Sequence, residues 1–158
     1  MDSNLAQKGF SLVELILIIL IIGVLVAVAT PRIGTITEDV NEKAVAERLL
    51  GDINLIRSMA MSQHDTTWLV VDQAQNQYSL YSGPTGSRVL IPDPETGDAI
   101  TLDLDSAYSD VQITSVSFGG SSEVSFNWWG TPSSGGTIEL NSGARTITLV
   151  AETGMVYE

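Results

Sequence analysis

An apolar stretch near the N-terminus constrains this chain more than any other feature of its sequence. Residues Leu15 to Ala29 form an unbroken apolar run, and the longer segment from Leu12 to Ala29 contains one charge, Glu14. As a helix these 18 residues rise roughly 27 Å, close to the about 30 Å of a bilayer's hydrocarbon core. A helix that is apolar on every face must be buried. We therefore expect residues 10–31 to form a transmembrane helix, covered by lipid or by other copies of itself.

Glu14 is the exception in this stretch. A carboxylate within a membrane-length helix is costly and points to a function by default. The nearest candidate partner is a free amine on Phe10, which exists only if the chain is cut after Gly9. Two unit charges about 4 Å apart attract by roughly 4 kcal/mol at an effective dielectric near 20. Such a pair closes within one chain or between neighbouring chains. The alternative is that Glu14 sits at headgroup depth and has no role.

The residues around Glu14 resemble a known processing signal. The hexapeptide from Gly9 to Glu14, followed by an apolar helix with Gly23 and Pro31, resembles the class III signal of type IV pilins and type II secretion pseudopilins. The resemblance implies that residues 1–9 are a leader, that a prepilin peptidase cleaves between Gly9 and Phe10, and that Phe10 is N-methylated. It also implies that Glu14 pairs with a neighbouring subunit's amine during filament assembly. The helix kink is expected at Gly23 and Pro31.

Composition narrows the possible partners. The chain has 19 acidic and 7 basic residues, a net charge of −12 and no cysteine. This charge repels nucleic acid and anionic lipid headgroups unless the few arginines cluster. The absence of cysteine excludes disulfides and thiolate metal sites. Residues 32–158 are enough for one small domain with its own core, and Lys8, before the apolar run, favours export of that domain.

A second, amphipathic helix is predicted over residues 32–62. Thr35 and Glu38 have the spacing of a capping box at a helix start. The helix is either continuous with the membrane helix or bent at Pro31. We expect its apolar stripe to pack on the domain's own sheet rather than on a foreign partner. The residues at helical spacing are Val45, Leu49, Ile53, Ile56 and Ala60, with Leu50 and Met59 beside them.

Residues 63–158 read as a β-rich domain, which we expect in the periplasm. Short runs with strand-like composition are separated by turns rich in Gly, Pro, Ser and Asn. An apolar parity shift between Ile113 and Val116 predicts a β-bulge. The predicted fold class is α+β: a long N-terminal helix, half membrane and half amphipathic, packed on a C-terminal antiparallel β-sheet domain. The predicted strands are 67–72, 77–81, 88–91, 111–118, 123–128, 137–140, 145–150 and 155–157.

The C-terminal region combines glycine turns with alternating apolar residues. The positions are Phe126-Asn127, Gly130, Pro132, Gly135-Gly136, Ile138, Leu140, Arg145 to Leu149 and Gly154 to Val156, together with Arg57 to Ala60 near the helix end. This order is similar to that of the H-type minor pseudopilins and of related minor pilins, which implies a structural subunit and no enzyme. The implied partners are other pilin or pseudopilin subunits, the prepilin peptidase, an inner-membrane assembly platform and, before assembly, lipid. The implied location is the inner membrane, single-pass, then a periplasmic or surface filament.

Other chemistry is weakly supported. His64 is the one histidine, and without a serine-centred elbow it is expected to be solvated at the end of the amphipathic helix. The acidic loop from Asp93 to Asp105 offers oxygen ligands for calcium, but its spacing matches no EF-hand, so no cofactor or metal is expected. Strand alternation predicts that Trp128 is buried and that Trp129 lies on the opposite face.

Two functions therefore remain. The first is a structural minor pilin or pseudopilin of a type II secretion or type IV pilus-like filament. The alternative is a DNA-binding minor pilin of a natural-transformation pilus, which binds through basic residues in its C-terminal region. In this chain that region has only Arg145, against Glu139, Glu152 and Glu158. Counterion release requires several cationic contacts, so the structural function is preferred.

Overall fold

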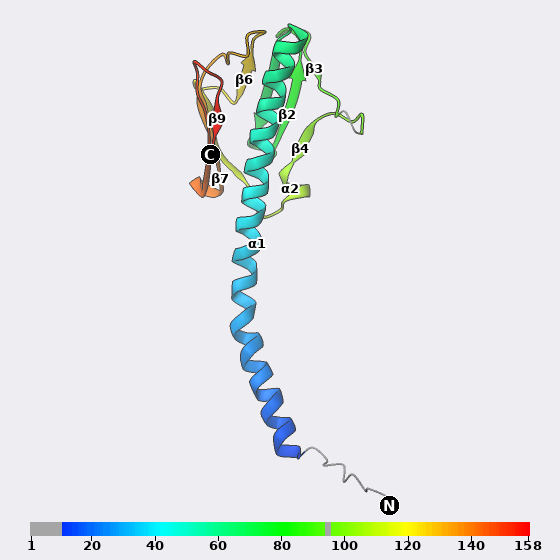
Figure 1. Ribbon diagram of the computed structural model, residues 1–158, viewed down its shortest axis with the longest axis vertical. Helices are drawn as coiled ribbons and strands as arrows, with labels where there is room; N and C mark the ends of the chain where they lie inside the picture. The colour runs from blue at the N-terminus through cyan, green and yellow to red at the C-terminus, as the bar shows by residue number, and fades with distance from the viewer. Residues whose placement is uncertain (1–10, 94–95) are drawn as a thin grey trace, which may run out of the picture. The chain divides into compact units, whose positions relative to one another are not determined.

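The computed structural model describes residues 11–93 and 96–158, with side chains described in these ranges except at 28–36 (Figure 1). The predicted cleavage residues Gly9 and Phe10 lie outside the described residues, as does Glu95 of the acidic loop. The chain divides into two compact units, residues 1–37 and residues 38–158. We call the second unit the head domain.

Helix α1 extends from Leu12 to Gln63. The helix is unbroken through Thr35, which is the continuous one of the two predicted alternatives, so the capping-box spacing of Thr35 and Glu38 does not mark a helix start. The kink predicted at Gly23 and Pro31 stays a prediction. Within the described residues, no helical segment combines the length and the apolarity that a membrane crossing requires.

The head domain contains two antiparallel sheets. The first has the order β3-β2-β1-β6, with β4 also paired to β2, and the second has the order β5-β7-β8-β9. The α+β class is therefore confirmed, with two sheets after the helix. The elements are β1 Thr67–Asp72, β2 Gln77–Ser82, β3 Val89–Leu90, β4 Thr101–Asp103, α2 Leu104–Ala107, β5 Ile113–Phe118, β6 Glu123–Phe126, β7 Gly136–Leu140, a 3-10 turn Asn141–Gly143, β8 Arg145–Leu149 and β9 Val156–Tyr157.

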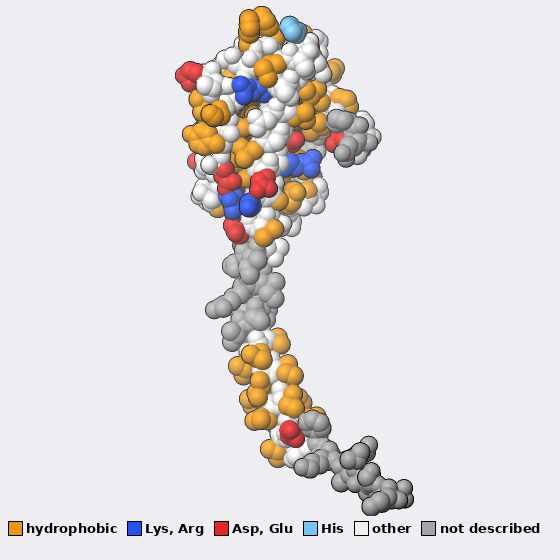
Figure 2. All heavy atoms as spheres, viewed as in Figure 1, with side chains coloured by type: hydrophobic (Ala, Val, Ile, Leu, Met, Phe, Trp, Pro, Cys, Tyr) orange, Lys and Arg blue, Asp and Glu red, His pale blue; other side chains and the backbone are white. Residues whose placement is uncertain are grey.

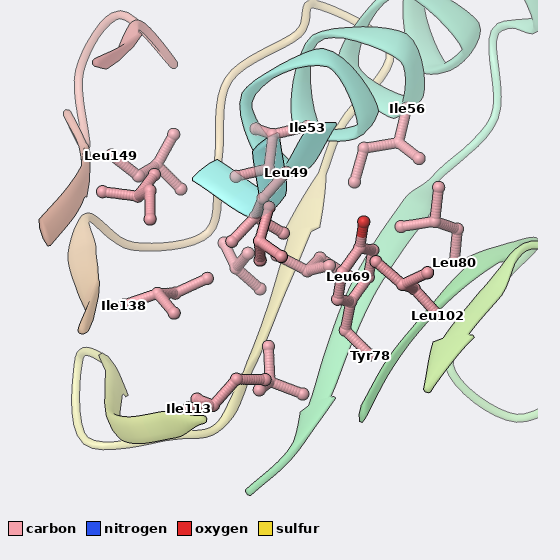
Figure 3. Close-up of a cluster of buried hydrophobic side chains, with 14 of the residues drawn as sticks. Leu49, Ile53, Ile56, Leu69, Tyr78, Leu80, Leu102, Ile113, Ile138 and Leu149 are labelled. Atoms are coloured by element: carbon pink, nitrogen blue, oxygen red, sulfur yellow. The ribbon is translucent and has the colours of Figure 1, made fainter. Parts of the chain in front are cut away.

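The apolar stripe of α1 forms the centre of the core. Its five predicted members are each no more than 1% exposed, and Leu50 and Met59 pack at the edge. Figure 3 shows Leu49 and Ile53 between Leu149 and Ile138 on one side and Leu69 and Leu80 on the other. Full burial of one such side chain contributes about 1.5–3 kcal/mol. The expectation that the stripe packs on the domain's own sheets is confirmed.

Two strand predictions have clear outcomes. The register between β5 and β7 shifts between Ile113 and Ser115, which confirms the predicted bulge. Trp128 was expected to be buried, and this is wrong, because its side chain is 46% exposed. Strand β6 ends at Phe126 and the chain turns, with Gly130 N donating to Asn127 O at 2.8 Å, so the alternation stops before Trp128.

The sequence analysis missed β4 and the helix α2. Both are short, and of the residues from Thr101 to Asp103 only Leu102 is buried, so they carry no periodic signal. Asp103 begins α2 by accepting a hydrogen bond from Ser106 N at 3.3 Å. The available clue was an aspartate followed three residues later by a serine, which is a weak cap signal.

A polar pair is built into the contact between α1 and β2. Tyr78 is 1% exposed, and its hydroxyl donates to Asp52 Oδ2 at 2.6 Å. Burial raises the pKa of the Asp52 carboxyl above its usual 3.8, and the Tyr78 hydrogen bond and the Arg48 charge partly oppose this. The pKa of Asp52 is higher in the folded chain than in the unfolded chain, so folding favours the protonated carboxyl. The resulting contribution to the free energy of unfolding is fully present below pH 3.8 and is lost as the pH rises through the folded-state pKa.

Tyr78→Phe removes the hydrogen bond that favours the charged carboxylate. We expect it to raise the pKa of Asp52 further and to lower the free energy of unfolding at neutral pH by about 1.5–3 kcal/mol. The cost shrinks as pH falls, because a protonated Asp52 needs the bond less. Carboxyl NMR titration and denaturant unfolding at several pH values measure both effects. Tyr157→Phe, at an exposed tyrosine, is the control; equal effects of the two variants would contradict the assignment.

Gly136 is required by close packing inside the second sheet. A Cβ on Gly136 would lie 1.9 Å from the Ser117 carbonyl oxygen and 2.7 Å from Phe118 Cα, whereas a Cβ on Gly86 would meet nothing within 4 Å. We expect Gly136→Ala to lower the free energy of unfolding by about 1–3 kcal/mol or more, as overpacking does. We expect Gly86→Ala to change it little. Thermal or denaturant unfolding measures both, and a fully stable Gly136→Ala variant would refute the packing argument.

Candidate functional site

The N-terminal half of α1 presents apolar side chains on all of its faces. The large apolar side chains from Leu12 to Val26 are between 40% and 73% exposed, and Figure 2 shows this segment as hydrophobic over most of its visible surface. Contiguous exposed apolar surface of this extent marks a contact with protein or membrane. We take residues 12–27 as the candidate assembly surface.

Glu14 lies in the first turn of α1, where the helix dipole favours a carboxylate. Its side chain is exposed. The predicted partner, the Phe10 amine, lies outside the described residues, so the pairing stays a prediction. Gly23 lies within the same helix, and a Cβ there would meet nothing within 4 Å. Pro31 is part of α1, but its side chain is not described.

Gly130 and Gly154, two glycines of the C-terminal motif, lie against each other and against Arg57 in the head domain. We call this contact the glycine joint. A Cβ on Gly154 would lie 2.7 Å from the Gly130 carbonyl oxygen and 3.1 Å from Arg57 Nε. Arg57 Nε donates to the same carbonyl at 3.1 Å. The joint therefore ties the end of α1 to the β6–β7 and β8–β9 loops. The sequence analysis noted Arg57 only as part of the segment resembling minor pseudopilins and could not assign it this structural role.

Arg145, the one cation of the C-terminal region, is held by carboxylates. Its guanidinium contacts Glu158, lies 2.9 Å from Asp39 Oδ1, and places Nε 4.0 Å from Glu42 Oε2. The hydrogen bond to Glu158, and to a smaller extent the one to Asp39, raises the pKa of Arg145 against the opposing effect of burial, so it stays charged. Asn141 Nδ2 adds a hydrogen bond to Glu42 Oε1 at 2.6 Å. This cluster fastens the polar start of the head-domain part of α1 to β8 and the C-terminal residue.

The residues considered for calcium have other roles where they are described. Asp103 caps α2, as noted above, and Asp105 Oδ1 accepts a hydrogen bond from Asn76 Nδ2 at 2.6 Å. Among the described side chains, no three or more His, Cys, Asp or Glu residues gather in a metal-binding arrangement. His64 is exposed at the end of α1, as predicted.

Comparison with protein families identifies two regions of the chain. The family model described as "Type II transport protein GspH" matches residues 45–154. A second model, described as "Prokaryotic N-terminal methylation motif", matches residues 4–30. The first match covers most of the head domain, and the second covers the apolar run with Glu14.

Individual relatives agree with these matches. Over 38 residues the chain is 50% identical to the "Type IV narrow pilus major component PilA5" of Thermus thermophilus, an overlap of 24% of this chain and 33% of that protein. The chain thus spans about a third of that relative's length. The minor pseudopilin EpsH of the Vibrio cholerae type 2 secretion system has the same fold, with a TM-score of 0.58, 10% identity, and coverage of 74% of this chain and 94% of that one.

The GspH match spans more than half of the chain and includes α1 from Val45, the strands β1 to β8 and the glycine joint. The methylation motif adds the signal that surrounds Glu14. The chain therefore belongs to the GspH family and is a pilin or pseudopilin subunit of a type II secretion or type IV pilus filament.

Proposed function

We propose that this chain is a minor subunit that enters its filament through α1 after its leader is removed. The observation that carries the proposal is the helix segment from Leu12 to Val26, whose apolar side chains are exposed all round and interrupted by the single acid Glu14. The fold of the head domain, shared with a minor pseudopilin, supports the minor class. The subunit role needs no enzyme activity and no cofactor.

The proposed mechanism has three steps. Prepilin peptidase cleaves between Gly9 and Phe10 and methylates the new Phe10 amine. Glu14 then meets the amine of a neighbouring subunit, which removes an isolated charge from an apolar setting. The helices leave the lipid and pack against each other, so the apolar side chains stay out of water throughout. An inner-membrane platform supports this transfer, and the head domain remains in the periplasm.

The alternative, DNA binding by the head domain, is disfavoured by how its cations are used. Arg145, the one basic residue of the C-terminal region, contacts three carboxylates. Release of this arginine to a phosphate would leave three carboxylates without their cation, including Glu42, whose side chain is 13% exposed. A net charge of −12 adds a long-range repulsion.

Glu14→Ala tests the assembly step. We expect the variant to be cleaved and methylated normally but to be absent from purified filaments, because the Phe10 amine of its neighbour lacks a counter-charge. Incorporation is measured by quantitative mass spectrometry of filaments, and cleavage by the mass of the membrane-extracted chain. Glu47→Ala, at an exposed acid of the same helix, is the control and should incorporate normally.

Gly9→Val separates processing from assembly. The larger side chain should block cleavage, leaving an unprocessed chain in the membrane that never reaches the filament. If Gly9→Val were cleaved, or if Glu14→Ala entered filaments as the wild type does, the corresponding step of the mechanism would be wrong.

The DNA alternative has its own test. We expect the full-length chain in detergent to give no shift of duplex DNA at physiological salt, and Arg145→Gln to leave this result unchanged. Binding that persists at this salt concentration and is lost in Arg145→Gln would favour the DNA-binding function instead.

A further inference from the structure

An aromatic turn lies at the end of the head domain where α1 finishes. The turn comprises residues 127–131 and exposes two of the chain's three tryptophans, Trp128 at 46% and Trp129 at 68%. Met61, near the end of α1, is 40% exposed, and a Cβ on Gly130 would lie 2.9 Å from its sulfur. Figure 2 shows hydrophobic side chains gathered beside the histidine at this end. Exposed tryptophan is typical of interface hot spots.

The turn is held rigid although its side chains are exposed. Asn127 Oδ1 accepts hydrogen bonds from Trp129 N and Thr131 N, both at 3.0 Å. From the other side, Arg57 Nε donates to Gly130 O at 3.1 Å. The fixed backbone therefore presents its side chains in one arrangement.

The rings themselves are also ordered by stacking. The ring centroids of Trp128 and Trp129 lie 4.1 Å apart at an angle of 30°, and Trp128 stacks on His64 at 5.7 Å. Side chains that are already ordered lose little entropy when a partner binds.

Charge indicates what kind of partner binds here. Apart from Arg57, each lysine or arginine whose side chain is described pairs with a carboxylate of the head domain. Acids remain in excess, and two exposed ones are close in sequence to residues that contact the turn: Asp65 follows His64, and Glu152 is two residues before Gly154. The cation at the turn, Arg57, donates its Nε hydrogen to the Gly130 carbonyl oxygen. Exposed indole faces bind a cation by cation–π contact, and the chain's net charge of −12 adds a Coulomb attraction for a basic partner.

We propose that the aromatic turn, with Met61 and His64, is a docking surface for a different protein that presents basic and apolar side chains. The apolar side chains of the partner would cover Met61 and Trp128, and a lysine or arginine of the partner would stack on Trp129. The net charge of −12 disfavours the other occupants, since nucleic acid, anionic membrane and a second copy of this chain are all negatively charged. The proposal does not depend on assembly through α1.

Site-specific photo-crosslinking in the native cells tests the proposal. The photoreactive residue p-benzoyl-phenylalanine replaces Trp129 in the full-length chain and, as a control, Val89, which is 65% exposed in β3. We expect a strong adduct from position 129 that maps to a lysine- or arginine-bearing segment of another protein, and little from position 89. No adduct above the control, or adducts on lipid, nucleic acid or a second copy, would overturn the proposal.

The mapped protein, purified, then supplies the affinity test. Trp129→Ala should weaken binding to the full-length chain about tenfold or more, as loss of a hot spot does, and Val89→Ala should not. The double variant Asp65→Asn with Glu152→Gln should weaken binding and reduce its salt dependence. Circular dichroism checks that each variant is folded. Unchanged affinity in a folded Trp129→Ala variant would contradict the proposal.

Discussion

The removal of apolar side chains from water governs both halves of α1, and the two halves meet this requirement differently. From Val45 to Ala60 the helix has one apolar stripe, and two sheets of the same chain cover it. From Leu12 to Val26 the helix is apolar all round, and its large side chains remain exposed. The head domain covers the stripe of its own part of α1, whereas a helix that is apolar all round must be covered on every face. The N-terminal half therefore needs lipid or neighbouring chains, which is the physical basis of a filament subunit.

Electrostatics organises the head domain around few cations. Arg88 pairs with Glu123 at 2.9 Å and lies over the rings of Trp68 and Tyr81. Arg145 contacts the carboxylates of Asp39, Glu42 and Glu158. Arg57 connects α1 to the β6–β7 loop through its hydrogen bond to the Gly130 carbonyl oxygen. These three arginines therefore each fix a contact between elements distant in sequence. The surplus acids leave the surface negative, which limits partners to those with complementary charge.

Periodicity made part of the fold predictable from sequence. The stripe through Leu49 and Ile53 repeats at helical spacing over several turns, so both the helix and its buried face could be identified. The bulge near Ile113 was visible as a parity shift. The division into two sheets was not visible, because strand order depends on pairings between distant residues. Trp128 was misplaced because alternation cannot show where a strand ends.

The site was predictable to the extent that it is a local motif. The hexapeptide from Gly9 to Glu14 identified the processing signal, which the methylation-motif match supports. The roles of Arg57, Asp52 and Gly154 could not be predicted, because each depends on a partner more than 20 residues away. Distances of this kind come from the fold and leave no spacing pattern in the sequence.

The central claim is that neighbouring subunits cover the apolar half of α1 in the filament. The natural chain has no cysteine, so Leu20→Cys provides a single reporter in this segment, and Val89→Cys provides an exposed control. In purified, lipid-free filaments we predict that a water-soluble maleimide labels residue 89 quickly and residue 20 only after the filaments are dissociated in detergent or denaturant. Rapid labelling of residue 20 in intact filaments would contradict the account.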